Sequence, residues 1–253
     1  MSSYKTYHYD IEYLNKKIYG VFFLPDKNKR YPTVVISHGF GGSYQDNLNY
    51  ALDLVNQGIA CYSFDFCGGS LHSQSSGKTS EMSVLTQLQD LLEIIKAIKK
   101  LPFVNQNQIF LLGESQGGLI SALAASRLKN EIRGLILLYP AFNIPNNARS
   151  EYSDIHLIPQ QFGLWGIPLG KCYYEDIYQL NVFESIGNYP GPVKIYHGSH
   201  DELVPVEYSK RAIQIYSHAD LEIINDVGHG FYGHISKKIG QRIIQFIKKN
   251  IIF

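Results

Sequence analysis

Apolar runs of strand length alternate with longer helical patterns through most of this chain. The runs that read as strands are Thr33–Ser37, Ala60–Phe66, Ile109–Leu112, Arg133–Tyr139, Val193–His197 and Leu221–Ile224. The helical patterns cover residues 45–57, 83–100 and 116–128, the surroundings of Ala212, and residues 235–247. Such alternation is typical of a mostly parallel sheet with helices on both faces. The sequence therefore predicts an α/β fold.

The N-terminal segments Thr6–Tyr13 and Lys17–Leu24 fit an antiparallel hairpin at the edge of this sheet. Together with the six runs above they predict a sheet of eight strands. No internal repeat or low-complexity linker divides the 253 residues, and a single α/β domain of this length is ordinary.

One region breaks the alternation. Residues 142–183 contain no clear strand but eight aromatic residues among 42. Because so long an irregular stretch is unusual in a compact domain, we interpret residues 142–187 as an inserted lid that binds substrate. Residues 1–141 and 188–253 would then form the core domain. The alternative is an ordinary insertion whose aromatic residues pack on the core.

Composition and charge limit the classes of function and the partners that we expect for this chain. The net charge is +1 and like charges form no long run, so we expect no nucleic-acid partner. The N-terminal residues lack the apolar core of a signal peptide, and no apolar stretch approaches the roughly 20 residues of a membrane span. Three cysteines form no CxxC pair and read as reduced thiols. We expect a cytoplasmic protein without a membrane partner.

A G-x-S-x-G motif occurs at residues 113–117, with Ser115 at its centre. The apolar run IFLL leads into it and the helical pattern LISALAAS follows, as expected for a nucleophile on a tight strand-to-helix turn. The glycines allow the sharp turn, and the helix N-terminus directs N–H groups to where negative charge develops. The alternative is a helix-capping serine in a glycine-rich turn.

A serine hydroxyl needs a base, and His229 is favoured because it lies in a loop between the last predicted strand and the last helix. Asp201 follows another strand and is the favoured acid, although Glu202 and Asp226 are rivals. The order Ser115, Asp201, His229 is the chain order of α/β-hydrolases.

Two further donors are needed for the oxyanion of a tetrahedral intermediate. One is the backbone N–H of Gln116, and the other is expected from the loop at residues 38–42, HGFGG, with Phe40 N–H favoured. His197 and His200 have a spacing that metal ligands also show, but no third ligand accompanies them. We expect no metal and no cofactor.

The segments HGFGG, FDFCGGS, GESQGG, HGSHDELVP and GHGF, in this order, resemble those of small bacterial esterases related to cinnamoyl and feruloyl esterases. The resemblance implies an insertion after the sixth core strand that binds the aromatic acyl group, with Tyr173 contacting its phenolic hydroxyl. Two departures are the sequence of residues 65–70 and Glu114, where the family often has histidine.

These patterns predict a carboxylesterase that cleaves esters of small acids, hydroxycinnamoyl-type acids among them, through an acyl-enzyme. Alternatives are a serine peptidase or acylaminoacyl hydrolase, and a monoacylglycerol-type lipase, because the same triad serves all of them. A non-catalytic receptor would require a broken triad. The expected partner is a small-molecule ester, and the aromatic residues of the insertion would also suit a homodimer contact.

Overall fold

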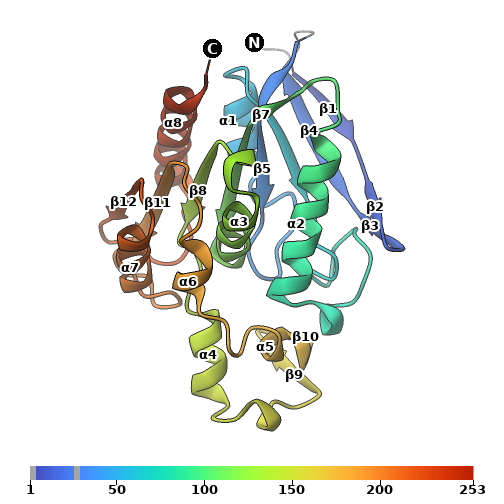
Figure 1. Cartoon of the computed structure of the whole chain (residues 1–253), viewed down its shortest axis with the longest axis vertical. Coiled ribbons are helices and arrows are strands. Elements are labelled where there is room, and N and C mark those ends of the chain that lie inside the picture. Colours follow the sequence, from blue (N-terminus) through green and yellow to red (C-terminus); the bar gives the residue numbers. More distant parts are fainter. Residues whose placement is uncertain (1–3, 26–28, 253) are drawn as a thin grey trace.

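The computed structural model describes residues 4–25 and 29–252, which are built around one large sheet (Figure 1). Within these residues the sheet has eight strands, in the order β1 (Tyr4–His8), β4 (Gly20–Pro25), β6 (Ala60–Phe64), β5 (Tyr31–Ser37), β7 (Val104–Glu114), β8 (Gly134–Leu138), β11 (Val193–Gly198) and β12 (Ala219–Ile224). Both pairs made by β4 are antiparallel, and every other pair is parallel. The predicted mostly parallel eight-stranded sheet is confirmed.

The N-terminal edge differs in detail from the predicted hairpin. The expected strands are interrupted near Tyr9 and Tyr19, so β1 and β4 join the main sheet while β2 (Ile11–Tyr13) and β3 (Lys16–Ile18) form a separate two-stranded sheet. Leu14 and Asn15, which connect β2 to β3, both have positive φ, as a tight two-residue hairpin loop requires.

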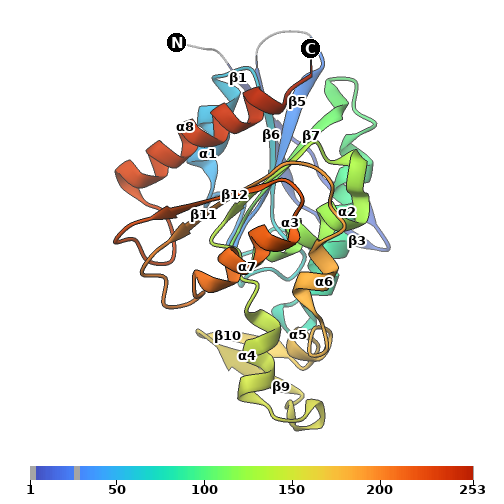
Figure 2. The ribbon, with the colours of Figure 1, turned by 60° about the vertical axis from the view of Figure 1, so that its left-hand side comes forward.

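Helices cover both faces of the sheet (Figure 2). Side chains alternate between the two faces along each strand, so each face packs against its own set of helices. Phe110 and Leu112 of β7 pack toward α1 (Leu48–Val55) and α8 (Gly233–Asn250). Ile109 and Leu111 join the core on the other face. The helices beyond α1 and α8 are α2 (Val84–Ile98), α3 (Ser115–Leu128), α4 (Ile144–Glu151), α5 (Cys172–Glu175), α6 (Val182–Ile186) and α7 (Glu207–Ile215), with short 3₁₀ turns η1 (Thr79–Glu81), η2 (Lys129–Glu131) and η3 (Ile155–Leu157).

The chain between β8 and β11 forms the end of the molecule that lies below the sheet in Figure 1. It contains α4, η3, α5, α6 and a hairpin of two short strands, β9 (Gln161–Leu164) and β10 (Ile167–Gly170). The sequence showed no strand in this region, so the hairpin corrects that expectation. Its four-residue strands are too short to produce a recognisable alternation, and a turn at Trp165 and Gly166, both with positive φ, sets the pairing.

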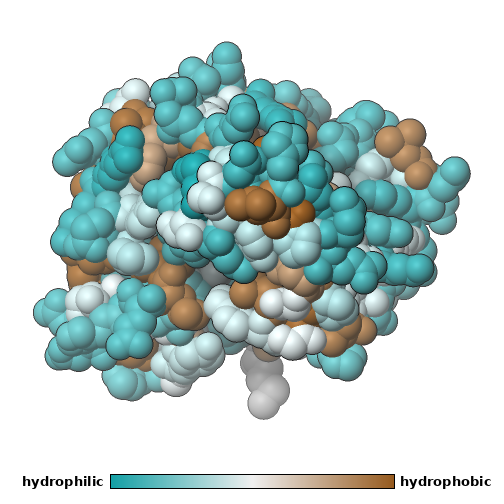
Figure 3. All heavy atoms as spheres, turned by 90° about the horizontal axis from the view of Figure 1, so that it is seen from below, coloured by the Kyte–Doolittle hydropathy of each residue, from teal (hydrophilic) through white to brown (hydrophobic). Residues whose placement is uncertain are grey.

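Seen from this end, the surface is mostly hydrophilic with separate apolar patches (Figure 3). Leu157 and Trp165 are the large apolar side chains of the insertion that are most exposed. No helix of the described residues combines the length and the apolar character that crossing a membrane demands. The three cysteines are free thiols.

The centre of the sheet sets the stability of the fold. Leu137 of β8 is completely buried, whereas Leu157 of η3 is 61% exposed. We expect Leu137→Ala to lower the free energy of unfolding by about 2–5 kcal/mol, since it leaves a cavity in the core. Leu157→Ala, the matched control, is expected to change it by less than about 0.5 kcal/mol. Urea unfolding followed by circular dichroism measures both, and equal losses would contradict this placement of the core.

Candidate active site

Ser115 lies at a turn where a strand is followed directly by a helix, with no loop between them. Strand β7 ends at Glu114 and helix α3 begins at Ser115, whose φ is +49°. A positive φ is costly for a residue with a side chain, and such strain persists only where the surrounding structure imposes it. Ser115 is thus the residue at which the chain reverses from strand to helix.

The two motif glycines let other backbone segments approach this turn. A Cβ on Gly117 would lie 2.3 Å from the carbonyl oxygen of His38 and 2.4 Å from that of Ser37. A Cβ on Gly113 would lie 2.3 Å from the carbonyl oxygen of Gly117. A side chain at Gly117 would push α3 away from the end of β5, and one at Gly113 would push α3 away from β7. The G-x-S-x-G pattern is therefore a packing requirement of this turn.

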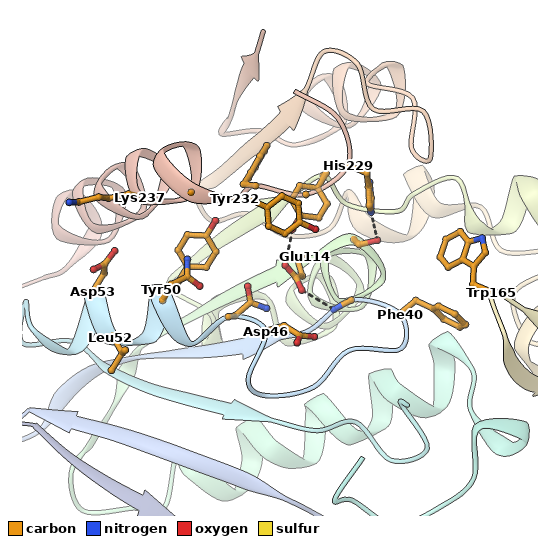
Figure 4. A pocket seen from close by; sticks show the side chains of 18 residues that line it. Phe40, Asp46, Tyr50, Leu52, Asp53, Glu114, Trp165, His229, Tyr232 and Lys237 are labelled. Carbon is orange, nitrogen blue, oxygen red and sulfur yellow. Dashed lines mark hydrogen bonds between the residues drawn. The ribbon is translucent and has the colours of Figure 1, made fainter. Parts of the chain in front are cut away.

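Ser115, His229 and Asp201 form one chain of hydrogen bonds. Ser115 Oγ lies 2.9 Å from His229 Nε2 (Figure 4), and His229 Nδ1 lies 2.8 Å from Asp201 Oδ2. The three residues follow β7, β12 and β11, so they meet at the carboxyl ends of the strands, where sites in open α/β sheets form. These distances fit a Ser115 hydroxyl that donates to His229 Nε2 and a His229 Nδ1–H that donates to the Asp201 carboxylate. The structure brings the three predicted residues together, and their catalytic roles stay a prediction.

Asp201 is held as a carboxylate. Its Oδ1 accepts the backbone N–H groups of Leu203 at 3.0 Å and Val204 at 2.9 Å. Burial alone would raise the pKa of Asp201, but hydrogen bonds from His197, His229 and the Val204 N–H outweigh burial and pull the pKa well below its usual value. The negative charge therefore stands ready to stabilise a protonated His229.

Neither rival acid bonds to His229 in the part of the chain that the structure describes. The Asp226 side chain is 89% exposed, and its Oδ1 lies 3.6 Å from His200 Nδ1. Glu202 is exposed at the mouth of a cavity. Within the described residues, Asp201 is the carboxylate that bonds to His229.

The glycine-rich loop after β5 lies against the nucleophile turn. A Cβ on Gly39 would be 3.4 Å from the Cβ of Ser115, so the loop backbone passes directly beside it. Within the described part of the chain, the backbone N–H groups of Phe40 and Gln116 have no hydrogen-bond acceptor. Two unpaired N–H groups next to Ser115 fit the predicted oxyanion donors.

His38 fixes the start of this loop. Its Nε2 accepts the N–H of Phe66 at 3.1 Å, and its Nδ1–H donates to the carbonyl of Gly39 at 2.7 Å. Burial lowers the pKa of His38, which favours the neutral ring that this pair of bonds requires. His38 is therefore a brace for the loop and not a candidate base.

His197, whose spacing from His200 suggested only metal binding, lies at the site behind Asp201. The buried ring bonds to Ser209 Oγ at 2.7 Å and to the Val204 carbonyl at 2.8 Å, and its Nε2 lies 3.2 Å from Asp201 Oδ2. The sequence signal that could have indicated this contact is the four-residue separation of His197 and Asp201 across one turn. His200 is exposed and lies near Asp226, and no group of three potential metal ligands occurs within residues 4–25 and 29–252.

Glu114, noted in the sequence only as a departure, ties three parts of the site together. Its Oε2 accepts the Tyr139 hydroxyl at 2.8 Å, and its Oε1 accepts the Gly39 N–H at 3.3 Å. The Tyr139 ring packs edge-on against the His229 imidazole, with 4.7 Å between their centroids. One carboxylate thus links strand β7, the glycine-rich loop after β5 and the tyrosine that packs against His229.

Two cavities meet at Ser115 and His229. The larger, of about 800 Å³, is lined by polar groups that include Asp46, Asp53 and Lys237 (Figure 4). The smaller, of about 330 Å³, lies between the core and the insertion. Its further lining residues are Gln116, Ala141, Asn143, Ile144, Asn147, Leu164, Tyr173, Tyr174, Glu202, Leu203 and Val204. Phe40 and Trp165, whose rings pack edge-on at 5.6 Å, border both cavities.

Tyr173 forms part of the wall of the smaller cavity. It is almost completely buried, and its hydroxyl donates to Gln116 Oε1 at 2.7 Å. Its ring lies edge-on to Phe40 at 5.6 Å. The predicted contact of this hydroxyl with a substrate phenol stays a prediction, but the hydroxyl proton already has a partner in the protein.

The site geometry agrees with comparisons to known proteins. A family model described as "Serine aminopeptidase, S33" matches residues 28–165, more than half of the chain. The chain belongs to this hydrolase family. The structure of Est1E from Butyrivibrio proteoclasticus with bound ferulic acid has a TM-score of 0.88 and 29% identity, over 96% of this chain and 98% of that one. The predicted resemblance to α/β-hydrolases of the feruloyl esterase type is confirmed.

More distant relatives include enzymes of other specificity. The proline iminopeptidase of Saccharolobus solfataricus is 25% identical over 74% of this chain and 55% of its own length. This chain therefore spans about half or less of the curated relatives that it matches. A monoacylglycerol lipase from Paleococcus ferrophilus has a TM-score of 0.71 at 17% identity, over 92% of this chain and 99% of that one, which shows the shared fold.

The electrostatics of Asp201 predict how stability changes with pH. An unfolded aspartate has a pKa of about 3.9, and the pKa of folded Asp201 lies well below its usual value. Its contribution to the free energy of unfolding is therefore complete above pH about 3.9 and is lost as the pH falls below that value. We expect Asp201→Asn to lose stability less steeply than the wild type between pH about 5 and 2.

Urea unfolding at a series of pH values measures these slopes. Asp226→Asn is the control, because its exposed carboxylate lacks such hydrogen bonds and its slope is expected to follow the wild type. The same slope for Asp201→Asn and the wild type would show that Asp201 is not held as a carboxylate in the folded protein.

Proposed function

We propose that this protein is a serine carboxylesterase that works through an acyl-enzyme on Ser115. The observation that carries the proposal is the hydrogen-bond chain from Ser115 through His229 to Asp201, at 2.9 and 2.8 Å, beside two unpaired backbone N–H groups. A nucleophile, a base with its orienting carboxylate, and oxyanion donors are the parts that acyl transfer needs.

In the proposed first step, His229 Nε2 accepts the Ser115 proton while Oγ attacks the ester carbonyl carbon. The Phe40 and Gln116 N–H groups bind the resulting oxyanion, and Asp201 stabilises the imidazolium. His229 then protonates the leaving alcohol as the carbon–oxygen ester bond breaks, which leaves the acyl group on Ser115. Water, deprotonated by His229, attacks this ester, and the acid departs as Oγ regains a proton.

We assign the acyl group to the smaller cavity. Its volume of about 330 Å³ suits a small acid, and Ile144, Leu164 and Tyr173 supply apolar and aromatic walls. The insertion, residues 142–187, covers this cavity in the proposal and acts as the substrate-binding lid. The likeness to Est1E with bound ferulic acid supports hydroxycinnamoyl-type acids as the acyl class.

The family description and the proline iminopeptidase relative favour a second candidate, an aminopeptidase or acylaminoacyl hydrolase. The same attack on a carbonyl carbon would cleave an amide, with an amine as the leaving group. The two candidates therefore differ in the leaving group and in the acyl group that the smaller cavity admits.

The role of Ser115 predicts the effect of removing its hydroxyl. We expect Ser115→Ala to lower kcat/KM for p-nitrophenyl acetate by at least about 10³-fold, because no acyl-enzyme can form. Ser126→Ala changes a serine at the far end of the same helix and is expected to keep activity within about twofold. Retention of wild-type turnover by Ser115→Ala, with unchanged circular dichroism, would exclude the proposed mechanism.

A substrate panel separates the candidate classes. We expect kcat/KM for methyl ferulate to exceed that for proline p-nitroanilide and for a long-chain monoacylglycerol, since the smaller cavity has aromatic walls and about 330 Å³ of space. Initial rates at matched enzyme concentrations provide the comparison. A preference for the aminoacyl amide would identify a peptidase, and a preference for the monoacylglycerol would identify a lipase.

A further inference from the structure

We propose that the hydroxyl of Tyr173 is a positioning group for the oxyanion donors, through which the insertion controls the rate of acyl transfer. This inference rests on the proposed function. It differs from the role implied by the family resemblance, in which the hydroxyl contacts a phenol of the substrate.

A relay of buried side chains carries the inference. The Tyr173 hydroxyl donates to Gln116 Oε1 at 2.7 Å, and Gln116 Nε2 donates to Gln87 Oε1 at 2.7 Å. Gln87 Nε2 in turn lies 3.0 Å from the sulfur of Met82. All four residues are at most 2% exposed. The relay therefore links the insertion, the nucleophile helix α3 and helix α2 without passing through solvent.

Gln116 sits at the decisive place in this relay. Its backbone N–H is one of the two unpaired donors beside Ser115, and its side chain is held at both ends of the amide. A buried amide that loses one partner tends to move toward a new one, because an unsatisfied polar group in the interior is costly. Movement of this side chain would displace the backbone to which it is attached.

Tyr173 also contacts the second oxyanion residue. Its ring packs edge-on against Phe40 at 5.6 Å, and Phe40 supplies the other unpaired N–H. One residue of the insertion thus touches the side chains of both residues that supply the proposed donors. The hydroxyl has one proton, and that proton is directed to Gln116 and not into the cavity.

A positioning role makes a kinetic prediction that recognition of the substrate does not make. The oxyanion forms in the transition state with every ester, so a displaced donor lowers kcat whatever the acyl group. Loss of a contact to a substrate phenol would instead affect only substrates that carry the phenol. Methyl p-coumarate and methyl cinnamate differ only in that hydroxyl and therefore separate the two roles.

The experiment compares Tyr173→Phe with the wild type on both esters. Phenylalanine keeps the ring contact to Phe40 and removes the bond to Gln116. We expect kcat to fall about tenfold on both esters, with KM changed by less than about twofold. Tyr178→Phe is the matched control, because its hydroxyl bonds within the insertion to the Tyr152 carbonyl and lies outside both cavities. Its kcat is expected to stay at the wild-type value.

A second variant guards against misfolding at Tyr173. Gln87→Met removes the acceptor of the Gln116 amide at a residue that lines neither cavity. We expect a similar fall in kcat, and we expect the double variant to lose little more than either single one, because both changes release the same side chain. A loss restricted to methyl p-coumarate, or unchanged kcat in both variants, would overturn the inference.

The rate at which a fluorophosphonate labels Ser115 separates failure of the inference from failure of the proposed function. Labelling needs the oxyanion donors but no particular acyl group. If the wild type is labelled yet cleaves neither ester, the proposed acyl class is wrong, and slower labelling of Tyr173→Phe still supports the relay. Labelling of that variant at the wild-type rate would overturn the relay, whichever esters are cleaved.

Discussion

The close approach of helix α3 to the end of strand β5 is the constraint on which the site depends. At Gly117 the helix backbone lies so near the carbonyls of Ser37 and His38 that no Cβ fits between them. This contact fixes the first turn of α3 against the loop that carries Phe40. The positive φ of Ser115 is the cost of that packing, and the resulting position of Oγ is its consequence. The positions of Ser115 and of the Phe40 and Gln116 N–H groups, the proposed nucleophile and oxyanion donors, therefore share this one backbone contact.

The fold was largely predictable because the centre of its sheet is buried on both faces, so that strands such as β8 appear as continuous apolar runs. The order of Ser115, Asp201 and His229 followed from their places after such runs. The insertion was not predictable in the same way. Its hairpin depends on a turn at Trp165. The wall that it gives to the smaller cavity depends on contacts between distant segments, such as that from Tyr173 to Gln116, which no local pattern encodes.

The sequence also did not predict the roles of residues whose type and position are compatible with more than one function. His197 shares a spacing with metal ligands, yet it bonds to Asp201 because the turn after β11 folds the carboxylate back onto the strand end. Glu114 looked like a departure from a family pattern, and it is the acceptor that joins Tyr139 to Gly39. In both cases the partner lies in a different segment, so only the assembled fold reveals the role.

These contacts show that the site is supported from two directions. On the side of the core, His197 and backbone N–H groups stabilise the negative charge of Asp201 behind His229. On the side of the insertion, Tyr173 touches the side chains of Gln116 and Phe40, whose unpaired N–H groups are the proposed oxyanion donors. Under the proposed mechanism, a change in the insertion would therefore alter the stabilisation of the oxyanion without disturbing His229. If the proposed roles hold, acyl preference and the rate of acyl transfer are coupled in this protein, because the wall proposed to receive the acyl group also contacts the residues of both proposed oxyanion donors.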